Sequence, residues 1–131
     1  MKYIIGDWVK YLTVKTKVAE VYKDNTYYLE PCRITECPKE EELYPIPLTM
    51  DILEKNGWKL KYHHLRKTYD DIEYIEYTNP NSFIILKYFC EDKCFLPFCC
   101  ANHEISSKDI FYVHEFQHLL FGLGLNYNIK I

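Results

Sequence analysis

The chain has 131 residues, the size of one ordinary domain or two very small ones, which excludes a large multidomain enzyme. Its formal net charge is -3 at pH 7 and its 16 basic residues are scattered, so no basic run predicts binding to duplex nucleic acid. Hydrophobic residues make up 48% and aromatic residues 17%, which favours a folded chain rich in β structure.

The first third of the sequence predicts short β-strands. Residues 7–12, 18–22 and 26–30 are rich in β-branched and aromatic residues with partial alternation of apolar and polar positions. Lys23-Asp24-Asn25 has turn chemistry, so residues 18–30 are predicted to form an antiparallel hairpin. We therefore expect an SH3-like β module over residues 1–44.

Residues 38–47 predict a linker, because a run of charges is followed by two prolines that favour extended backbone. A short helix is expected over residues 48–57, with Thr49 as its N-cap and Gly57 at its end. Residues 58–62, 72–77 and 83–90 then predict an antiparallel sheet.

A last helix is predicted to begin after Ser106 or Ser107, to end at Gly122 or Gly124, and to pack on this sheet. The predicted fold is thus α+β. An SH3-like β module over residues 1–44 precedes a compact unit over residues 45–131, which holds a helix, an antiparallel sheet and the C-terminal helix.

The last helix contains His114-Glu115-Phe116-Gln117-His118, which matches the H-E-x-x-H pattern of zinc peptidases. The two histidines lie on one helix face, where they can bind a metal, and Glu115 would act as the general base. A helical projection places the apolar stripe nearly opposite these histidines, so they face either solvent or a cleft.

A peptidase of this kind needs a third protein ligand, and no His, Asp, Glu or Cys follows Leu119. His103, Glu104, His63, His64 or a cysteine remain as upstream donors, and no spacing selects one of them. We therefore assign no catalytic, cofactor-binding or metal-binding residue, and keep His114, Glu115 and His118 with zinc as the alternative hypothesis.

The other polar clusters predict surface features. Adjacent strand residues point to opposite faces, so His63 and His64 are not expected to chelate one metal. Asp70, Asp71, Glu73 and Glu76 fit a solvated strand edge.

Six cysteines are present, and no signal-peptide core precedes the first charges, so free thiols are expected. A structural zinc site would draw on the clusters 32–37 and 90–100, although the second cluster lacks the short knuckle spacing of such sites. Since no apolar run is long enough to cross a bilayer, we expect a cytoplasmic protein without membrane contact.

Three segments resemble a family of small uncharacterised proteins encoded by Bacteroidetes genomes, prophages and phages. They are residues 5–10 (IGDWVK), 45–58 (PIPLTMDILEKNGW) and 112–118 (YVHEFQH), and the family has similar "IPLT-x-x-ILEKNGF" and "YVHELQ" segments. The resemblance carries no activity, and the family frequently has another residue at the position of His118. It implies a phage-related accessory protein, in the host cytoplasm or associated with the virion.

We therefore predict a non-catalytic protein-binding or assembly module. A zinc-dependent metallohydrolase is the alternative. A third hypothesis is single-stranded nucleic-acid binding, in which bases stack on Trp8, Tyr11 and Tyr27 of the β module.

Overall fold

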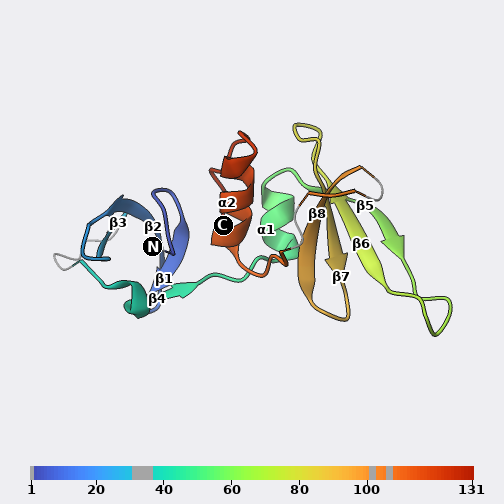
Figure 1. The fold of residues 1–131 in the computed structure, drawn as a ribbon, viewed down its shortest axis with the longest axis horizontal. Coiled ribbons are helices and arrows are strands. Elements are labelled where there is room, and N and C mark those ends of the chain that lie inside the picture. The colour runs from blue at the N-terminus through green and yellow to red at the C-terminus, as the bar shows by residue number, and fades with distance from the viewer. Residues whose placement is uncertain (1, 31–36, 101–102, 106–107) are drawn as a thin grey trace. The chain divides into compact units, whose positions relative to one another are not determined.

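A computed structural model describes residues 2–30, 37–100, 103–105 and 108–131 (Figure 1). The chain divides into two compact units. The first comprises Met1–Pro47 and Tyr112–Ile129, and the second comprises Leu48–Phe111 and Lys130–Ile131. In the described residues each unit has one antiparallel sheet and one α-helix, in agreement with the predicted α+β class.

The sheet of the first unit has the strand order β3-β2-β1-β4, with every neighbouring pair antiparallel. Its strands are β1 (Trp8–Tyr11), β2 (Val14–Val21), β3 (Tyr27–Glu30) and β4 (Leu43–Pro45), and the 3-10 helix η1 (Glu40–Glu42) precedes β4. The predicted hairpin is confirmed, since β2 and β3 pair across a turn. Asn25 adopts a left-handed conformation in that turn (φ 62°), which asparagine tolerates well.

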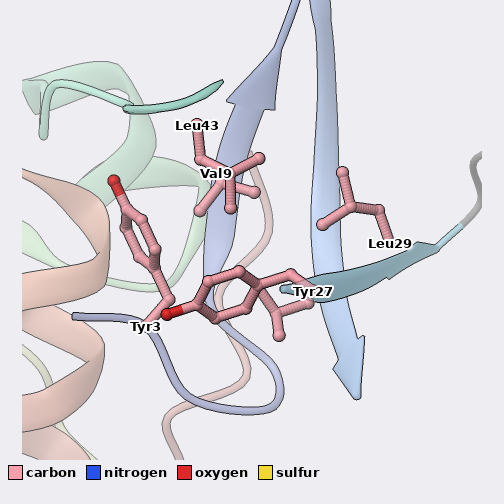
Figure 2. Packing of buried hydrophobic residues seen from close by; sticks show 6 residues of the cluster. Tyr3, Val9, Tyr27, Leu29 and Leu43 are labelled. Atoms are coloured by element: carbon pink, nitrogen blue, oxygen red, sulfur yellow. The ribbon is translucent and has the colours of Figure 1, made fainter. Parts of the chain in front are cut away.

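The core of the first unit is built from alternate strand positions and one residue that precedes the sheet. Tyr27 and Leu29 point inward from β3, while Tyr28 and Glu30 stay exposed. Figure 2 shows them beside Val9 of β1, Leu43 of β4 and Tyr3. The rings of Tyr3 and Tyr27 meet edge to face, with centroids 5.8 Å apart.

The segment predicted as a linker belongs to this unit, so that prediction is wrong. Leu43 is buried and pairs with Tyr11, and Ile46 is buried as well. The two prolines do favour extended backbone, but here the extended segment becomes an edge strand, a place where proline is tolerated.

The C-terminal helix α2 (Val113–Gly122) also belongs to the first unit, which corrects the predicted boundary between residues 1–44 and 45–131. The backbone of Val113 donates to the carbonyl of Ile46 at 2.8 Å. The side chain of Gln117 bonds the backbone of Gly6 and Trp8. These contacts join residues more than 60 positions apart, which local sequence patterns cannot reveal.

Helix α2 begins later than predicted. Tyr112 is its N-cap, whereas the proposed caps Ser106 and Ser107 lie outside the described residues. Its buried face is also shifted from the predicted apolar stripe, because two polar side chains, His114 and Gln117, lie within it.

The second unit combines α1 (Met50–Lys55) with a five-stranded antiparallel sheet of order β5-β6-β7-β8-β9 (Figure 1). Its strands are β5 (Lys59–His64), β6 (Tyr74–Thr78), β7 (Ile85–Phe89), β8 (Cys94–Cys100) and β9 (His103–Glu104). Thr49 caps α1 as predicted, by accepting a hydrogen bond from the Ile52 amide at 3.2 Å. Gly57 follows the helix with φ +85°, a conformation that favours glycine.

No helix in the described part of the chain combines the length and the apolar character required to cross a bilayer.

Candidate functional site

The two histidines of the H-E-x-x-H pattern lie on α2 in different environments. His114 is only 4% exposed, and its ring meets the ring of Tyr3 edge to face at 5.0 Å. The His118 side chain is 34% exposed. The two imidazole rings are 5.6 Å apart at their centroids and nearly perpendicular. Neither side chain faces bulk solvent completely, so the histidine face of the helix is partly covered.

Glu115, the candidate general base, stabilises the start of the helix. Its Oε1 accepts a hydrogen bond from the backbone amide of Tyr112 at 3.0 Å, which forms one half of a capping box. This carboxylate also lies in the first turn, where a negative charge complements the helix dipole. The geometry therefore gives Glu115 a structural role.

His118 contacts a buried carboxyl group that the sequence analysis did not single out. Its Nε2 lies 2.6 Å from Oδ2 of Asp7, whose side chain is completely buried. The same Oδ2 accepts the backbone amide of Ile4 at 2.9 Å, and Oδ1 of Asp7 has no hydrogen-bond partner among the described residues. Asp7 thus links the start of β1 to α2.

The phenol of Tyr3 lies near this carboxyl group. Its hydroxyl is buried and has no hydrogen-bond partner in the part of the chain that the structure describes. Burial, followed by the charges of Glu40 and Asp7, raises the pKa of Tyr3 to about 12. The Tyr3 hydroxyl is therefore protonated at every physiological pH. It cannot act as an acid or base near pH 7 beside Asp7 and His118.

The β module does not present the predicted set of stacking rings. Tyr27 is fully buried in the core, and its hydroxyl donates to Glu40 at 2.6 Å. The indole of Trp8 is half-buried, where its Nε1 donates to the carbonyl of Ile129 and Lys17 lies over its ring. Stacking of bases on Tyr27 would require the core to open, so that part of the nucleic-acid hypothesis is wrong.

Three metal-ligating side chains converge in the second unit instead. A ring nitrogen of His63, a carboxylate oxygen of Glu73 and Sγ of Cys90 all lie within 4.8 Å of one another. They form the only such group of three or more His, Cys, Asp or Glu in the described ranges. The possible ligand atoms of His114, His118 and Asp7 do not form such a group.

The elements around this group explain the convergence. His63 lies on β5 opposite Ile75 of β6, and Ile75 lies opposite Tyr88 of β7. Glu73 is two residues before Ile75 and Cys90 two residues after Tyr88, so the three side chains share one face of the sheet. The amide of Cys90 donates to the carbonyl of Glu73 at 3.2 Å, which holds these two residues side by side.

Hydrogen bonds connect the members of this group. Nε2 of His63 lies 2.8 Å from Oε1 of Glu73, and the amide of Cys90 bonds the carbonyl of Glu73. Burial raises the pKa of the Cys90 thiol, and the negative charge of Glu73 adds to that shift.

The opposite face of the same strands carries aromatic rings. His64 stacks on Tyr74 at 4.9 Å, with Tyr62 and Phe89 on either side of this pair. Nε2 of His64 is 2.9 Å from both carboxylate oxygens of Asp71, and this contact lowers the pKa of Asp71. His63 and His64 therefore face apart, as predicted, and each has its own acidic partner.

Strand β5 is one of the two outer strands of its sheet, as described, and β9 is the other. In the described residues it pairs with β6 alone. Large apolar side chains remain exposed along and after it, with Leu60 56%, Tyr62 46% and Leu65 60% exposed. We call residues 55–67 the β5 edge. Basic residues occupy five of its positions, acidic residues none, and the basic residues are Lys55, Lys59, Lys61, Arg66 and Lys67.

No family model, no curated protein and no solved structure matches this chain.

Sequence patterns place His63, Glu73 and the cysteines in separate segments and give no sign that three of these side chains converge. They also give no sign of Asp7 and Gln117 as polar residues of the first unit. A buried Asp gives no local signal, because its partner His118 lies 111 residues away.

Proposed function

We propose that this protein is a non-catalytic protein-binding module that holds an extended, acidic segment of another protein along the β5 edge. The observation that carries the proposal is an outer strand that is both basic and lined with exposed apolar side chains. In this mode of recognition, the partner's backbone continues the sheet and its alternate side chains contact the strand on each face.

The position of β5 supports this mode of binding. An outer strand presents backbone N–H and C=O groups on the side away from its neighbour, and these groups pair readily with another extended chain. Leu60 and Tyr62 would supply apolar contact for the partner's side chains on the two faces of the sheet. An added strand would bury both of these side chains.

The positive charge of the β5 edge favours an acidic partner segment. The β5 edge carries five basic residues in a chain whose formal net charge is -3. Two copies of this edge would repel one another, and lysines on outer strands generally prevent such self-pairing. A segment rich in Glu and Asp would instead be attracted, and its association rate would rise at low salt.

Nucleic acid fits this surface less well. The aromatic rings of Tyr62, His64 and Tyr74 lie beside the carboxylates of Asp71 and Glu76, which repel phosphates. His64 is already stacked on Tyr74 and bonded to Asp71. A peptide that runs along the strand edge avoids both obstacles.

The metallohydrolase hypothesis for His114, Glu115 and His118 has less support. Its general base would be a carboxylate that already caps α2, and His118 already contacts Asp7. We therefore favour a structural role for this helix.

The wider context of the proposal is that of a phage- or prophage-encoded accessory protein in the host cytoplasm or in the virion. Its basis is the resemblance of residues 5–10, 45–58 and 112–118 to proteins of that origin. We propose further that the first unit is an SH3-like module, in keeping with its short antiparallel strands wrapped around one small core.

Peptide selection tests the proposal. A phage-displayed library of random dodecapeptides is selected on the immobilised full-length protein, and enriched peptides are measured by fluorescence anisotropy. We expect enrichment of sequences in which acidic and apolar residues alternate. The double variant Lys59→Glu/Lys61→Glu should bind them at least about tenfold more weakly, because attraction becomes repulsion.

The matched control is Lys10→Glu/Lys15→Glu, which reverses two exposed lysines paired across β1 and β2 of the first unit. It should keep the wild-type affinity. Equal affinity of both double variants for the selected peptides would contradict the proposal. So would displacement of the peptides by a short oligothymidylate, which would identify single-stranded nucleic acid as the ligand.

A further inference from the structure

We propose that His63, Glu73 and Cys90 form a zinc-binding site with an open fourth coordination position. The site lies on one face of the β5-β6-β7 part of the second unit. This inference is independent of the proposed binding function, because it rests on different side-chain atoms and a different ligand.

The geometry brings together donors from strand β5 and from the residues next to the ends of β6 and β7. The three ligand atoms lie within 4.8 Å of one another, and the hydrogen bond from the Cys90 amide to the Glu73 carbonyl continues the pairing of β6 and β7 to these two residues. In a tetrahedral zinc site, ligand atoms are separated by about 3.3 to 3.7 Å, given bond lengths of about 2.0 to 2.3 Å. The 2.8 Å contact between His63 and Glu73 would open by about half an ångström, a shift that rotation of two part-exposed side chains supplies.

The donor set suits zinc better than the other common divalent ions. A thiolate and an imidazole bind zinc strongly, whereas calcium and magnesium require oxygen ligands. A Cys thiolate, a Glu carboxylate and a neutral His together carry two negative charges. These charges balance the zinc ion, so that burial of the complex costs little electrostatic free energy.

The three side chains already interact in the absence of an ion. The carboxylate of Glu73 contacts the His63 ring at 2.8 Å, and a carboxylate oxygen lies within 4.8 Å of the Cys90 thiol. When zinc binds, it replaces the thiol proton, which is released to solvent. The three side chains then contact the ion instead of one another, and the backbone keeps its conformation. The pre-existing cluster therefore limits the conformational cost of binding.

Exposure indicates what occupies the fourth position. The side chains of His63 and Glu73 are 39% and 38% exposed, so the cluster is open to water on one side. Zinc held by three protein ligands keeps a water molecule or an exogenous ligand in its fourth position. We expect a water-bearing site rather than a closed structural one.

Metal titration tests the site. The full-length protein, reduced with a phosphine, is freed of metal and titrated with zinc alone by calorimetry and with cobalt alone by absorption spectroscopy. We expect stoichiometric binding. For cobalt, we also expect a thiolate charge-transfer band in the near ultraviolet and strong visible bands typical of four-coordinate geometry.

Matched variants separate this site from adventitious binding. Cys90→Ser and His63→Gln should each weaken zinc affinity by at least about 100-fold, more than loss of an outer-shell partner does. Cys99→Ser and His64→Gln change an exposed cysteine and the adjacent histidine of the opposite face, and should leave affinity unchanged. Circular dichroism shows whether each variant is folded.

Three outcomes would overturn the proposal. One is the absence of zinc binding by the folded wild type at micromolar concentration. The second is a cobalt complex of the wild type without a thiolate band. The third is loss of binding in Cys99→Ser or His64→Gln with retention in Cys90→Ser, which would place the metal elsewhere.

Discussion

Replacement of Gln117 by leucine is expected to lower the free energy of unfolding by about 3 to 5 kcal/mol. Gln117 is the one glutamine of the sequence, and its side chain is fully buried. Its Oε1 accepts the amide of Trp8, and its Nε2 donates to the carbonyls of Gly6 and Tyr127, at 2.9 to 3.0 Å. Leucine would leave three backbone groups without partners, and each such group costs about 1 to 3 kcal/mol when buried.

Urea-induced unfolding, followed by circular dichroism, measures this loss. The matched control is Asn128→Leu, which removes an exposed amide that bonds a single lysine, Lys17. That control should cost no more than about 0.5 kcal/mol, as do most surface substitutions. If Gln117→Leu and Asn128→Leu had similar effects, the amide of Gln117 would not be what joins α2 to the strands of the first unit.

Replacement of His118 by alanine is expected to cost about 2 to 4 kcal/mol, because it leaves the carboxyl group of Asp7 buried without its partner. In an Asp7→Asn background the same replacement should cost about 1 kcal/mol or less, since no buried charge remains to be compensated. The two effects should thus differ by a coupling free energy of about 1 to 3 kcal/mol.

A double-mutant cycle measures that coupling through urea midpoints of the wild type, the two single variants and the double variant. Glu115→Gln serves as the control, because a glutamine can still accept the Tyr112 amide in the capping box. It should change stability only slightly. Additive costs of the Asp7 and His118 changes would show that the 2.6 Å contact contributes nothing to the fold.

Local elements were predicted well from local signals. Thr49 and Gly57 mark the ends of α1 by chemistry that acts over three or four residues, and the hairpin of β2 and β3 follows from its turn residues. The partner of α2 was predicted wrongly. Its assignment depends on Gln117 and Val113, whose hydrogen bonds reach residues far away along the chain.

The zinc-ligand cluster depends on a single irregularity of the sheet. If β5 and β6 paired without interruption from Lys59 and Thr78, His63 would lie opposite Tyr74. The register shift between Leu60 and Tyr62 instead places His63 opposite Ile75. A shift of one residue reverses the face of every following side chain, so His63 joins Glu73 and Cys90 only because of this bulge. The sequence carries no clear signal of the bulge.

For Cys90 and Cys94, too, a local irregularity of the backbone decides which face of the sheet each side chain occupies. A continuous strand over residues 90–94 would place both thiols on one side. The chain turns between β7 and β8 instead, with Lys93 in a left-handed conformation (φ 54°). Cys94 then lies opposite Phe89, on the other face of the sheet from Cys90.

The division of the chain also has a consequence for its synthesis. The first unit needs residues 112–129, which leave the ribosome only after the whole of residues 48–111 has been made. During translation the early strands lack α2, so the carboxyl group of Asp7 lacks the His118 imidazole and the amide of Trp8 lacks the Gln117 side chain until the chain is nearly finished. Domains generally fold as units, and those with distant contacts fold more slowly. The first unit can therefore be completed only after all strands of the second unit have been made, and the second unit in turn requires Lys130 and Ile131 from the end of the chain.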